Sequence, residues 1–375
     1  MKKLYILGTR GIPARHGGFE TFAEKLSLYL VNRGWQVFVY CQEDGDGQIY
    51  ETIWSGVNCV HVPVKEGGVF GSVIFDWKAS KHALNRTGIF LTLGYNTASF
   101  NILQRFGKQV NIINMDGIEW RREKWGSIAK LWFWLNERAG CWLGNHLVAD
   151  HPGIKEHLSS RVRSDKITMI PYGGDEIGSA DSDLLKAYEL TAGGFSVIIA
   201  RPEPENSLLE MVRAFSRKKR NHKLVVLGNL EQDSSSYHRS VLDAASEEVV
   251  FVGAIYQAPV VQALRFYCRF YLHGHRVGGT NPSLVEAMGA GCAIIAQDNQ
   301  FNRWVAGEGA VYFEDEDSLD LLLRQLSNDS SRLSYMRRAC KARFYECFTW
   351  TNVLAQYEEL LLDWYPEETY CQSQH

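Results

Sequence analysis

The stretch LYILGTRGIPARHGGFETFAEKLSLYLVNRGWQVFVY, residues 4–40, decides the fold class of the first half of the chain. Its apolar run at 4–7 predicts a short buried strand that ends at Gly8, and a glycine-bearing loop follows. Apolar side chains then recur at helical spacing from Phe19 to Leu30, and Gly34 ends that helix. Because a second strand follows at 37–40, the segment predicts a parallel βαβ unit.

The same alternation of strands and helices continues along the whole chain. In the first half we expect further strands at 57–63, 89–93, 110–114, 146–149 and 166–170. In the second half we expect strands at 195–200, 223–227, 249–252, 270–273, 293–296 and 310–312, separated by helices at 208–217, 258–267, 283–288 and 318–326. The pattern predicts two doubly wound α/β domains that meet at a cleft.

The boundary between the two domains is expected near residue 174. Residues 175–194 are acidic, small and glycine-bearing, which is typical of a linker or a mobile loop. We therefore predict one domain at 1–174 and a second at 175–349. The amphipathic helix in about 350–375 is expected to pack back on the first domain.

Composition and charge narrow the class of protein. The 375 residues are 45% hydrophobic and 22% charged, which suits about two ordinary globular domains. With a net charge of −3 there is no global basic field, so we expect no nucleic-acid partner. The eight cysteines show no CxxC pair or metal-ligand spacing, which favours free thiols in a reducing cytosol and no metal site. No signal peptide or spanning segment is evident, so we expect a cytoplasmic protein, with peripheral contact at the membrane left open.

The segment GGTNPSLVEAMGAG, residues 278–291, carries the clearest sign of function. Asn281 suits a helix N-cap, and Pro282 suits the first turn, where its missing N–H needs no partner. The start of such a helix attracts a phosphate, and Glu286 one turn later offers a carboxylate to sugar hydroxyls. The segment therefore indicates either a nucleotide-sugar site or a simple helix-initiating turn.

Four motifs of the second half occur in one order and spacing. They are ARPEPENSLLEM at 200–211, LVVLG at 224–228, VFVG at 250–253 and the 278–291 segment. In this the chain resembles the donor domain of GT-B glycosyltransferases of the large retaining family 4. That resemblance implies two Rossmann-like domains around a cleft and a nucleotide-sugar donor.

Three further motifs narrow the resemblance. They are GTRGIPARHGGFET at 8–21, NMDGIEWRREKW at 114–125 and HGHRVGGTNPS at 273–283. With these the chain is similar to bacterial rhamnosyltransferases that build capsule, O-antigen or exopolysaccharide units on a lipid carrier. The resemblance implies dTDP-rhamnose as donor and a polyprenyl-diphosphate-linked saccharide as acceptor.

The chain departs from the broad family at two positions. Gly278 stands where the first of two glutamates eight positions apart is usual, and Glu286 fills the second position. In the strand-end motif Arg201 is kept, but Asn206 replaces the usual lysine. Since the lost lysine removes a charge facing the diphosphate, we expect His275 and Arg276 to compensate for it.

The resemblance assigns the donor site to both domains. Arg201 and His275 are expected to stabilise the departing diphosphate, together with the amides of the helix start at 280–284. Glycines at the first loop allow close approach of the backbone to a ligand. The predicted donor-binding residues are Gly17, Gly18, Asn206, Gly279, Thr280, Asn281, Pro282, Ser283, Leu284 and Glu286. The alternatives are an interface ion pair for Arg201, a structural role for His275 and a dipole-favoured position for Glu286.

The acceptor side is expected in the first domain. Asp116 follows a strand end and is expected to orient the acceptor hydroxyl, with Glu119 beside it, or both belong to a surface loop. The other predicted acceptor-side residues are Phe19, Glu20 and Trp120.

Five of the eleven tryptophans lie within residues 120–142, interleaved with basic residues. This mixture suits either a membrane interface or a packed core helix with snorkelling cations. The expected activity is therefore a metal-independent, retaining glycosyl transfer. The open alternatives are a UDP- or GDP-sugar donor, or a non-catalytic binding partner of a synthase complex.

Overall fold

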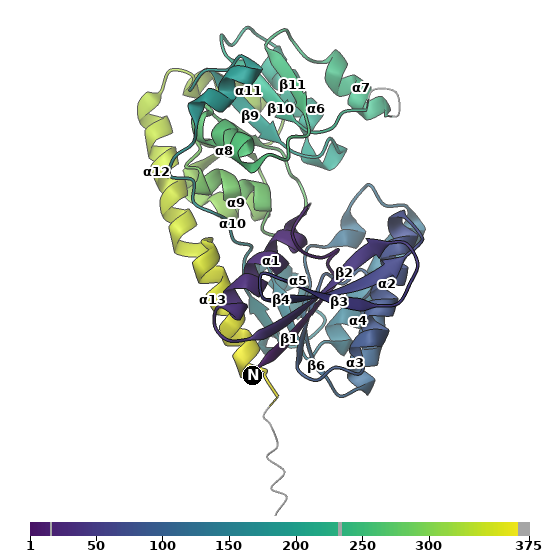
Figure 1. Cartoon of the computed structure of the whole chain (residues 1–375). Coiled ribbons are helices and arrows are strands. Elements are labelled where there is room, and N and C mark those ends of the chain that lie inside the picture. The colour runs from purple at the N-terminus through teal and green to yellow at the C-terminus, as the bar shows by residue number, and fades with distance from the viewer. Residues whose placement is uncertain (16, 232–234, 367–375) are drawn as a thin grey trace, which may run out of the picture. The chain divides into compact units, whose positions relative to one another are not determined.

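A computed structural model describes residues 1–15, 17–231 and 235–366 of the chain (Figure 1). The chain divides into two compact units. Unit 1 comprises Met1–Arg121, Trp125–Pro171 and Thr351–His375, and unit 2 comprises Arg122–Lys124 and Tyr172–Trp350. The predicted segment 350–375 thus falls mainly in unit 1, and its residues 367–375 lie outside the described part.

Unit 1 is built on an eight-stranded sheet of order β3-β4-β2-β1-β5-β6-β7-β8. All neighbouring strands pair in parallel except β3 and β4. The strands are β1 Lys3–Leu7, β2 Gln36–Asp44, β3 Tyr50–Trp54, β4 Val57–Val64, β5 Ile89–Leu93, β6 Val110–Asn114, β7 His146–Ala149 and β8 Ile167–Met169. The parallel doubly wound sheet confirms the predicted fold class for this half.

Helices cover both faces of the unit 1 sheet (Figure 1). On one side lie α2 Gly68–Ala83, the short 3₁₀ helix η1 Ala98–Asn101, α3 Ile102–Phe106 and α4 Ser127–Leu143. On the other lie α1 Gly18–Val31 and α13 Trp350–Asp363, while α5 Pro152–Ser159 follows β7. This layering leaves the carboxyl ends of β1, β5 and β6 free to carry ligand-binding loops.

The hairpin strand β3 was not predicted. It pairs antiparallel with β4 at the edge of the sheet, with Thr52 opposite Cys59. Its residues YETIW are almost all exposed, so no apolar run marks it. An edge strand of this kind lacks the hydrophobic pattern on which the other strands were recognised.

The last helix packs on the first unit. Tyr357 of α13 is buried, and its hydroxyl accepts a hydrogen bond from the Asn114 side-chain amide at the end of β6 at 2.8 Å. Its ring contacts the Phe22 ring of α1 at 4.6 Å between centroids. Glu358 accepts the Tyr29 hydroxyl at 3.1 Å, and Tyr365 accepts the Lys3 amide. The C-terminal helix therefore completes the α1 face of unit 1.

Unit 2 contains a six-stranded parallel sheet of order β11-β10-β9-β12-β13-β14. The strands are β9 Phe195–Ile199, β10 Lys223–Leu227, β11 Val249–Gly253, β12 Tyr271–His273, β13 Ile294–Gln297 and β14 Ala310–Phe313. Its helices are α6 Leu208–Ser216, α7 Ser236–Asp243, α8 Ala258–Tyr267, α9 Pro282–Gly289, α10 Gln300–Ala306, α11 Glu316–Leu326 and α12 Ser330–Cys347. The second predicted Rossmann-like domain is therefore present.

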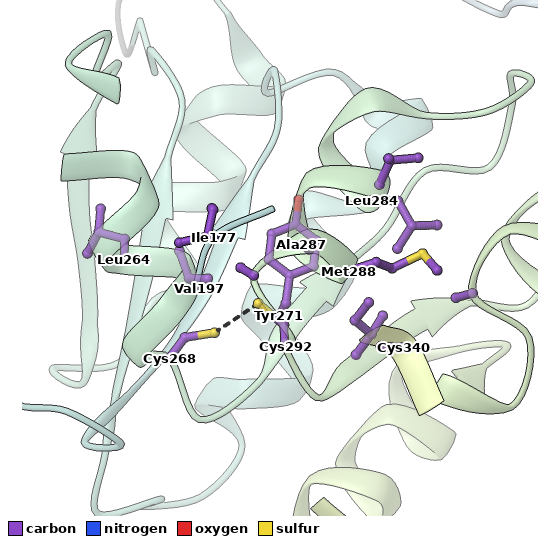
Figure 2. Packing of buried hydrophobic residues seen from close by; sticks show 14 of the residues in the cluster. Ile177, Val197, Leu264, Cys268, Tyr271, Leu284, Ala287, Met288, Cys292 and Cys340 are labelled. Carbon is purple, nitrogen blue, oxygen red and sulfur yellow. Dashed lines mark hydrogen bonds between the residues drawn. The ribbon is translucent and has the colours of Figure 1, made fainter. Parts of the chain in front are cut away.

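A dense apolar core fixes α9 against this sheet (Figure 2). Leu284, Ala287 and Met288 of α9 are fully buried and pack toward Tyr271 of β12. Nearby, the thiols of Cys268 and Cys292 lie 3.8 Å apart in the hydrogen bond drawn in Figure 2. Rigid packing of α9 holds the start of that helix at the carboxyl end of β12.

Residues 175–194 do not form the predicted free linker. They contain the 3₁₀ helix η4 Ser182–Tyr188, in which Leu185 is buried, and Ile177 also joins the unit 2 core. The Tyr267 hydroxyl of α8 donates to the Ala180 carbonyl at 2.7 Å. Apolar residues spaced among the acidic ones pack this segment against α8. The composition of the segment, which is mostly acidic and small, did not indicate this packing.

Candidate functional site

The start of α9 is built as the sequence predicts. Asn281 is the N-cap, its side chain accepts the Ser283 amide at 3.0 Å, and Pro282 occupies the first turn. Thr280 just before it is buried. The cap and the proline define a fixed helix start at the end of β12.

The predicted anion site at this helix start needs correction. Ser283 donates its amide to the Asn281 side chain, and Leu284 donates its amide to the Asn281 carbonyl at 3.1 Å. Pro282 has no N–H. The Ser283 hydroxyl is also used, because it bonds the Tyr271 hydroxyl at 2.5 Å and the Ile199 carbonyl at 3.3 Å. The amides of Ser283 and Leu284 are therefore used within the helix start itself.

Arg201 lies two residues beyond β9, at the carboxyl end of the unit 2 sheet. Its side chain is exposed, and its guanidinium forms no hydrogen bond or ion pair with the residues that the structure describes. Its carbonyl, in contrast, accepts the Glu203 amide at 2.7 Å and the Asn206 side-chain amide at 2.8 Å. Within its own unit, the backbone of Arg201 is fixed while its charge is available to a ligand.

Asn206, at the position of the usual lysine, is 2% exposed. Its Nδ2 donates to the Arg201 carbonyl, and its Oδ1 is buried without a partner among the described residues. The side chain thus braces the Arg201 turn from inside. In this conformation Asn206 positions Arg201 and does not itself reach outward.

His275 and Arg276 do not replace the missing positive charge as predicted. Burial, followed by the nearby Arg201 charge, lowers the pKa of His275 to about 4, so its ring is neutral at pH 7. Arg276 donates to the Ser207 hydroxyl and forms an ion pair with Glu210, both at 2.8 Å. His275 is left as a neutral hydrogen-bonding group that stacks on His273 with ring centroids 4.5 Å apart.

Glu286 is held by a residue that the sequence did not suggest. Arg265 of α8 is buried and pairs with one Glu286 oxygen at 2.5 Å, while the Glu286 side chain keeps 38% of its surface exposed. The ion pair fixes the carboxylate at one oxygen and leaves the side chain accessible. This arrangement suits a carboxylate that accepts from adjacent sugar hydroxyls.

Gly278 is required by its backbone. Its φ is 128°, which L side chains rarely adopt, although a Cβ built there meets no atom within 4 Å. A side chain at this position would be strained by the backbone and not by a lack of space.

In unit 1 the β1–α1 loop is braced by acidic residues of α1. Gly17 is the N-cap of α1 with φ 91°, and a Cβ there would lie 2.5 Å from the Glu20 carboxylate. Glu20 accepts the Arg10 amide at 3.4 Å, and Glu24 accepts the Ala14 amide at 2.7 Å. Gly18 begins the helix, so the loop is shaped by local contacts. His16, whose charge would add to this loop, lies outside the described residues.

The 114–125 motif follows β6. Asp116 has a positive φ of 48°, and its amide donates to the Asn114 side chain at 3.0 Å. Glu119 donates its amide to the Tyr95 hydroxyl and accepts the Trp125 indole. A left-handed aspartate at a strand end is a strained position of the kind found at functional sites.

Trp120 is tied to a buried network. Its indole donates to Glu137 at 2.8 Å, and Glu137 also bonds His157 and Arg161. Glu137 is only 1% exposed. Trp120 therefore has a structural anchor beside the acceptor-side role predicted for it.

A pocket of about 80 Å³ lies at the carboxyl ends of β1 and β5 in unit 1. Phe19 lines it together with Asp76 of α2, which no sequence motif marked. The Thr97 hydroxyl donates to Asp76 at 2.7 Å, and burial raises the pKa of that carboxyl to about 6. Asn101, 3% exposed, adds an Nδ2 without a partner among the described residues. The pocket thus offers both an acceptor and a donor to a hydroxyl-bearing ligand.

No group of three or more His, Cys, Asp or Glu in the described ranges is arranged to hold a metal ion. No described helix is long and apolar enough to cross a membrane. Metal independence of the reaction stays a prediction.

Comparisons with known proteins follow the two units. Residues 1–175 match a domain of unknown function (DUF1972), and residues 205–359 match a family described as glycosyl transferase-like. No curated protein matches the chain in sequence.

Solved structures match nearly the whole chain in fold. Sucrose-phosphate synthase from Thermosynechococcus elongatus gives a TM-score of 0.79 at 14% identity, covering 97% of this chain and 99% of that one. HepE from Anabaena, in complex with UDP-glucose, gives 0.74 at 14% identity, covering 97% and 100%. An α,α-trehalose-phosphate synthase (UDP-forming) from Burkholderia xenovorans gives 0.72 at 13% identity, covering 96% and 100%.

These likenesses establish the two Rossmann-like domains as the GT-B fold. The glycosyl transferase-like family matches most of unit 2, from residue 205 onward. The matched range includes Glu286, and Arg201 lies just before it. The chain therefore has the GT-B fold, and its second unit carries a glycosyl transferase-like domain.

Proposed function

We propose that the protein transfers L-rhamnose from dTDP-rhamnose to a polyprenyl-diphosphate-linked saccharide, with retention and without a metal ion. The observation that carries the donor half is Arg201, whose backbone is fixed and whose guanidinium is unpaired among the described residues. A nucleoside diphosphate leaves with negative charge, which such a cation stabilises by charge-assisted hydrogen bonds. HepE was solved with UDP-glucose, which supports a nucleotide-sugar donor for this fold.

In the proposed reaction the bond from the anomeric carbon to the diphosphate oxygen breaks. The acceptor oxygen bonds the same carbon on the same face, and its proton passes to the departing phosphate oxygen. No protein carboxylate must take that proton. Arg201 neutralises the phosphate charge, and Glu286, oriented by Arg265, accepts hydrogen bonds from the donor ribose.

The acceptor half of the proposal rests on unit 1. The pocket beside Phe19 contains Asp76, Thr97 and Asn101, which suit the hydroxyls of a saccharide. Asp116 and Glu119 follow the neighbouring strand β6 and are proposed to orient the reacting hydroxyl. The protein would work at the cytoplasmic face of the membrane, where a lipid-linked saccharide is presented.

A donor panel tests the proposal. Thermal unfolding is followed with dTDP, UDP and GDP, since a ligand at ~100 times its Kd adds ~2.7 kcal/mol to the unfolding free energy. We expect dTDP to give the largest stabilisation and Glu286→Ala to reduce it. Stronger stabilisation by UDP or GDP would assign the donor to that nucleotide instead, and UDP is the nucleotide with which HepE of the same fold was solved.

The remaining candidate is a non-catalytic binding partner of a synthase complex. Gly278 and Asn206 favour it, because both residues depart from the glutamate and lysine usual in the broad family. Nucleotide binding without turnover on any lipid-linked acceptor would support this candidate and refute the proposed enzyme.

A further inference from the structure

One face of unit 1 carries an unusual set of exposed apolar side chains. This face, formed by the outward surfaces of α2, α3 and α4, is called the α2–α4 face (Figure 1). It contains ten of the eighteen large hydrophobic residues that are exposed in the described chain. They are Val69, Phe70, Trp77, Ile102, Phe106, Ile128, Leu131, Trp132, Leu135 and Trp142.

The exposure is large for individual residues. Phe70 is 80% exposed, Phe106 78%, Ile128 88% and Trp142 82%. On α4 the residues 128, 131, 135 and 142 follow helical spacing and so form one stripe. A stripe of this kind on a monomer marks an interaction surface, because scattered exposure alone would not align it.

The elements of this face adjoin one another through η1, which packs against both α2 and α4. The Trp77 ring of α2 meets the Phe100 ring of η1 edge-on at 5.3 Å. The Trp132 indole of α4 donates to the Asn96 carbonyl at 2.7 Å, and the Ser99 amide donates to Asn136 of α4. The apolar residues therefore belong to one continuous layer.

The exposed charged residues within these three helices are of one sign, while the exposed Glu66 and Glu123 lie in the segments before α2 and α4. Lys81, Arg105 and Arg138 are exposed, and they belong to α2, α3 and α4 respectively. The two acidic residues of these helices do not oppose them, because Glu137 is buried and Asp76 lines the pocket. The whole chain has a net charge of −3, so this basic character is local.

We propose that the α2–α4 face docks on the surface of an anionic phospholipid bilayer. Aromatic and aliphatic side chains enter the headgroup boundary, while lysine and arginine meet anionic headgroups. The charge complementarity singles out this partner, since an apolar protein interface would not need three helices that expose only cations. Docking of the face stands by itself, and its use in catalysis rests on the proposed lipid-linked acceptor.

The α2–α4 face adjoins the unit 1 pocket, so docking would bring the pocket close to the bilayer. Trp77 directly follows the pocket residue Asp76 on α2, and Trp132 bonds the carbonyl of Asn96, which also lines the pocket. A saccharide carried on a membrane-embedded lipid would thus enter the pocket from the docked edge. The bilayer would hold enzyme and acceptor at one surface, which raises the effective concentration of the acceptor.

Vesicle flotation of the full chain tests the proposal. The probes are phosphatidylcholine vesicles and matched vesicles with added phosphatidylglycerol. We expect the wild type to float with the anionic vesicles only. Phe70→Ser/Phe106→Ser and Arg105→Glu/Arg138→Glu should each weaken binding about tenfold or more. The matched control Tyr256→Ser/Leu321→Ser removes exposed apolar residues of unit 2 and should bind as the wild type.

Two further measurements keep the outcome clear. Melting curves confirm that the variants fold, and sedimentation at equal concentration reports self-association. The proposal is overturned if the wild type does not float with anionic vesicles, or if the face variants float equally well. It is also overturned if the wild type forms a dimer that the variants lose, because the α2–α4 face would then bind a second copy of the chain. Turnover on a short-chain, water-soluble acceptor should be unchanged in the face variants. If the wild type also fails on that acceptor, the proposed function is refuted while the flotation result still decides docking.

Discussion

Replacing Arg201 by alanine should separate catalysis from stability. The guanidinium is exposed and has no hydrogen bond or ion pair within the described ranges, so its loss should change the unfolding free energy by no more than about 0.5 kcal/mol. Its loss removes a preorganised cation from the departing diphosphate, which is typically worth roughly 3–4 kcal/mol, or about 10²–10³ in kcat. We therefore expect near-complete loss of turnover in a protein of normal stability.

The assay measures released nucleotide under saturating acceptor, beside urea unfolding of the same preparations. Arg213→Ala is the matched control, because Arg213 is another exposed arginine of unit 2 whose contact to Glu316 is 3.6 Å long. It should lose neither activity nor stability. Arg201→Lys should recover part of kcat, since it restores the charge but not the bidentate geometry. A kcat within threefold of wild type for Arg201→Ala would refute the role given to this residue, as would a fall of several kcal/mol in stability.

Three further predictions concern the residues around this cation and in the unit 1 pocket. Asn206→Ala removes a buried partner of the Arg201 carbonyl and should cost about 1–3 kcal/mol in urea unfolding while raising the donor KM; an unchanged KM would contradict its bracing role. Glu286→Ala leaves the buried Arg265 unpaired and should destabilise the protein, whereas Glu286→Ala/Arg265→Met should recover stability but not nucleotide binding, as measured by melting and calorimetry. Since burial raises the pKa of Asp76 to about 6, its carboxylate forms as the pH rises through that value, and kcat/KM for the acceptor should rise with it. This rise with pH should vanish in Asp76→Asn, and its persistence there would assign the titration to another group.

The strands of both units were predictable because they are buried on both faces. Runs such as Leu224–Leu227 are apolar throughout, as parallel strands between helix layers must be. The edge strand β3 has no such run, and only its pairing with β4 makes it a strand. Helix α12 was also missed, because it buries only Met336, Cys340 and Phe344, a narrow stripe in a charged sequence.

The candidate site was predictable only where one segment determines it. The cap at Asn281 and Pro282 is local, so the sequence indicated it correctly. The partner of Glu286 lies 21 residues away on α8. The raised pKa of Asp76 comes from its burial, which the Thr97 hydroxyl partly offsets from another segment. The neutral state of His275 follows from burial, which a motif does not report. Contacts between distant segments and the burial of charged groups are set by tertiary packing. The sequence motifs therefore could not predict the partner of Glu286 or the neutral state of His275.

The central proposal is that this protein moves rhamnose from dTDP-rhamnose to a lipid-linked saccharide. The most direct test incubates the full chain with labelled dTDP-rhamnose and a polyprenyl-diphosphate-linked saccharide, and follows the label into the lipid phase. Product NMR reports the anomeric configuration in the same experiment. We predict transfer at a rate abolished by Arg201→Ala, with the anomeric configuration of the donor retained. Label that stays in the aqueous phase while UDP- or GDP-sugars are transferred, or an inverted product, would contradict the account.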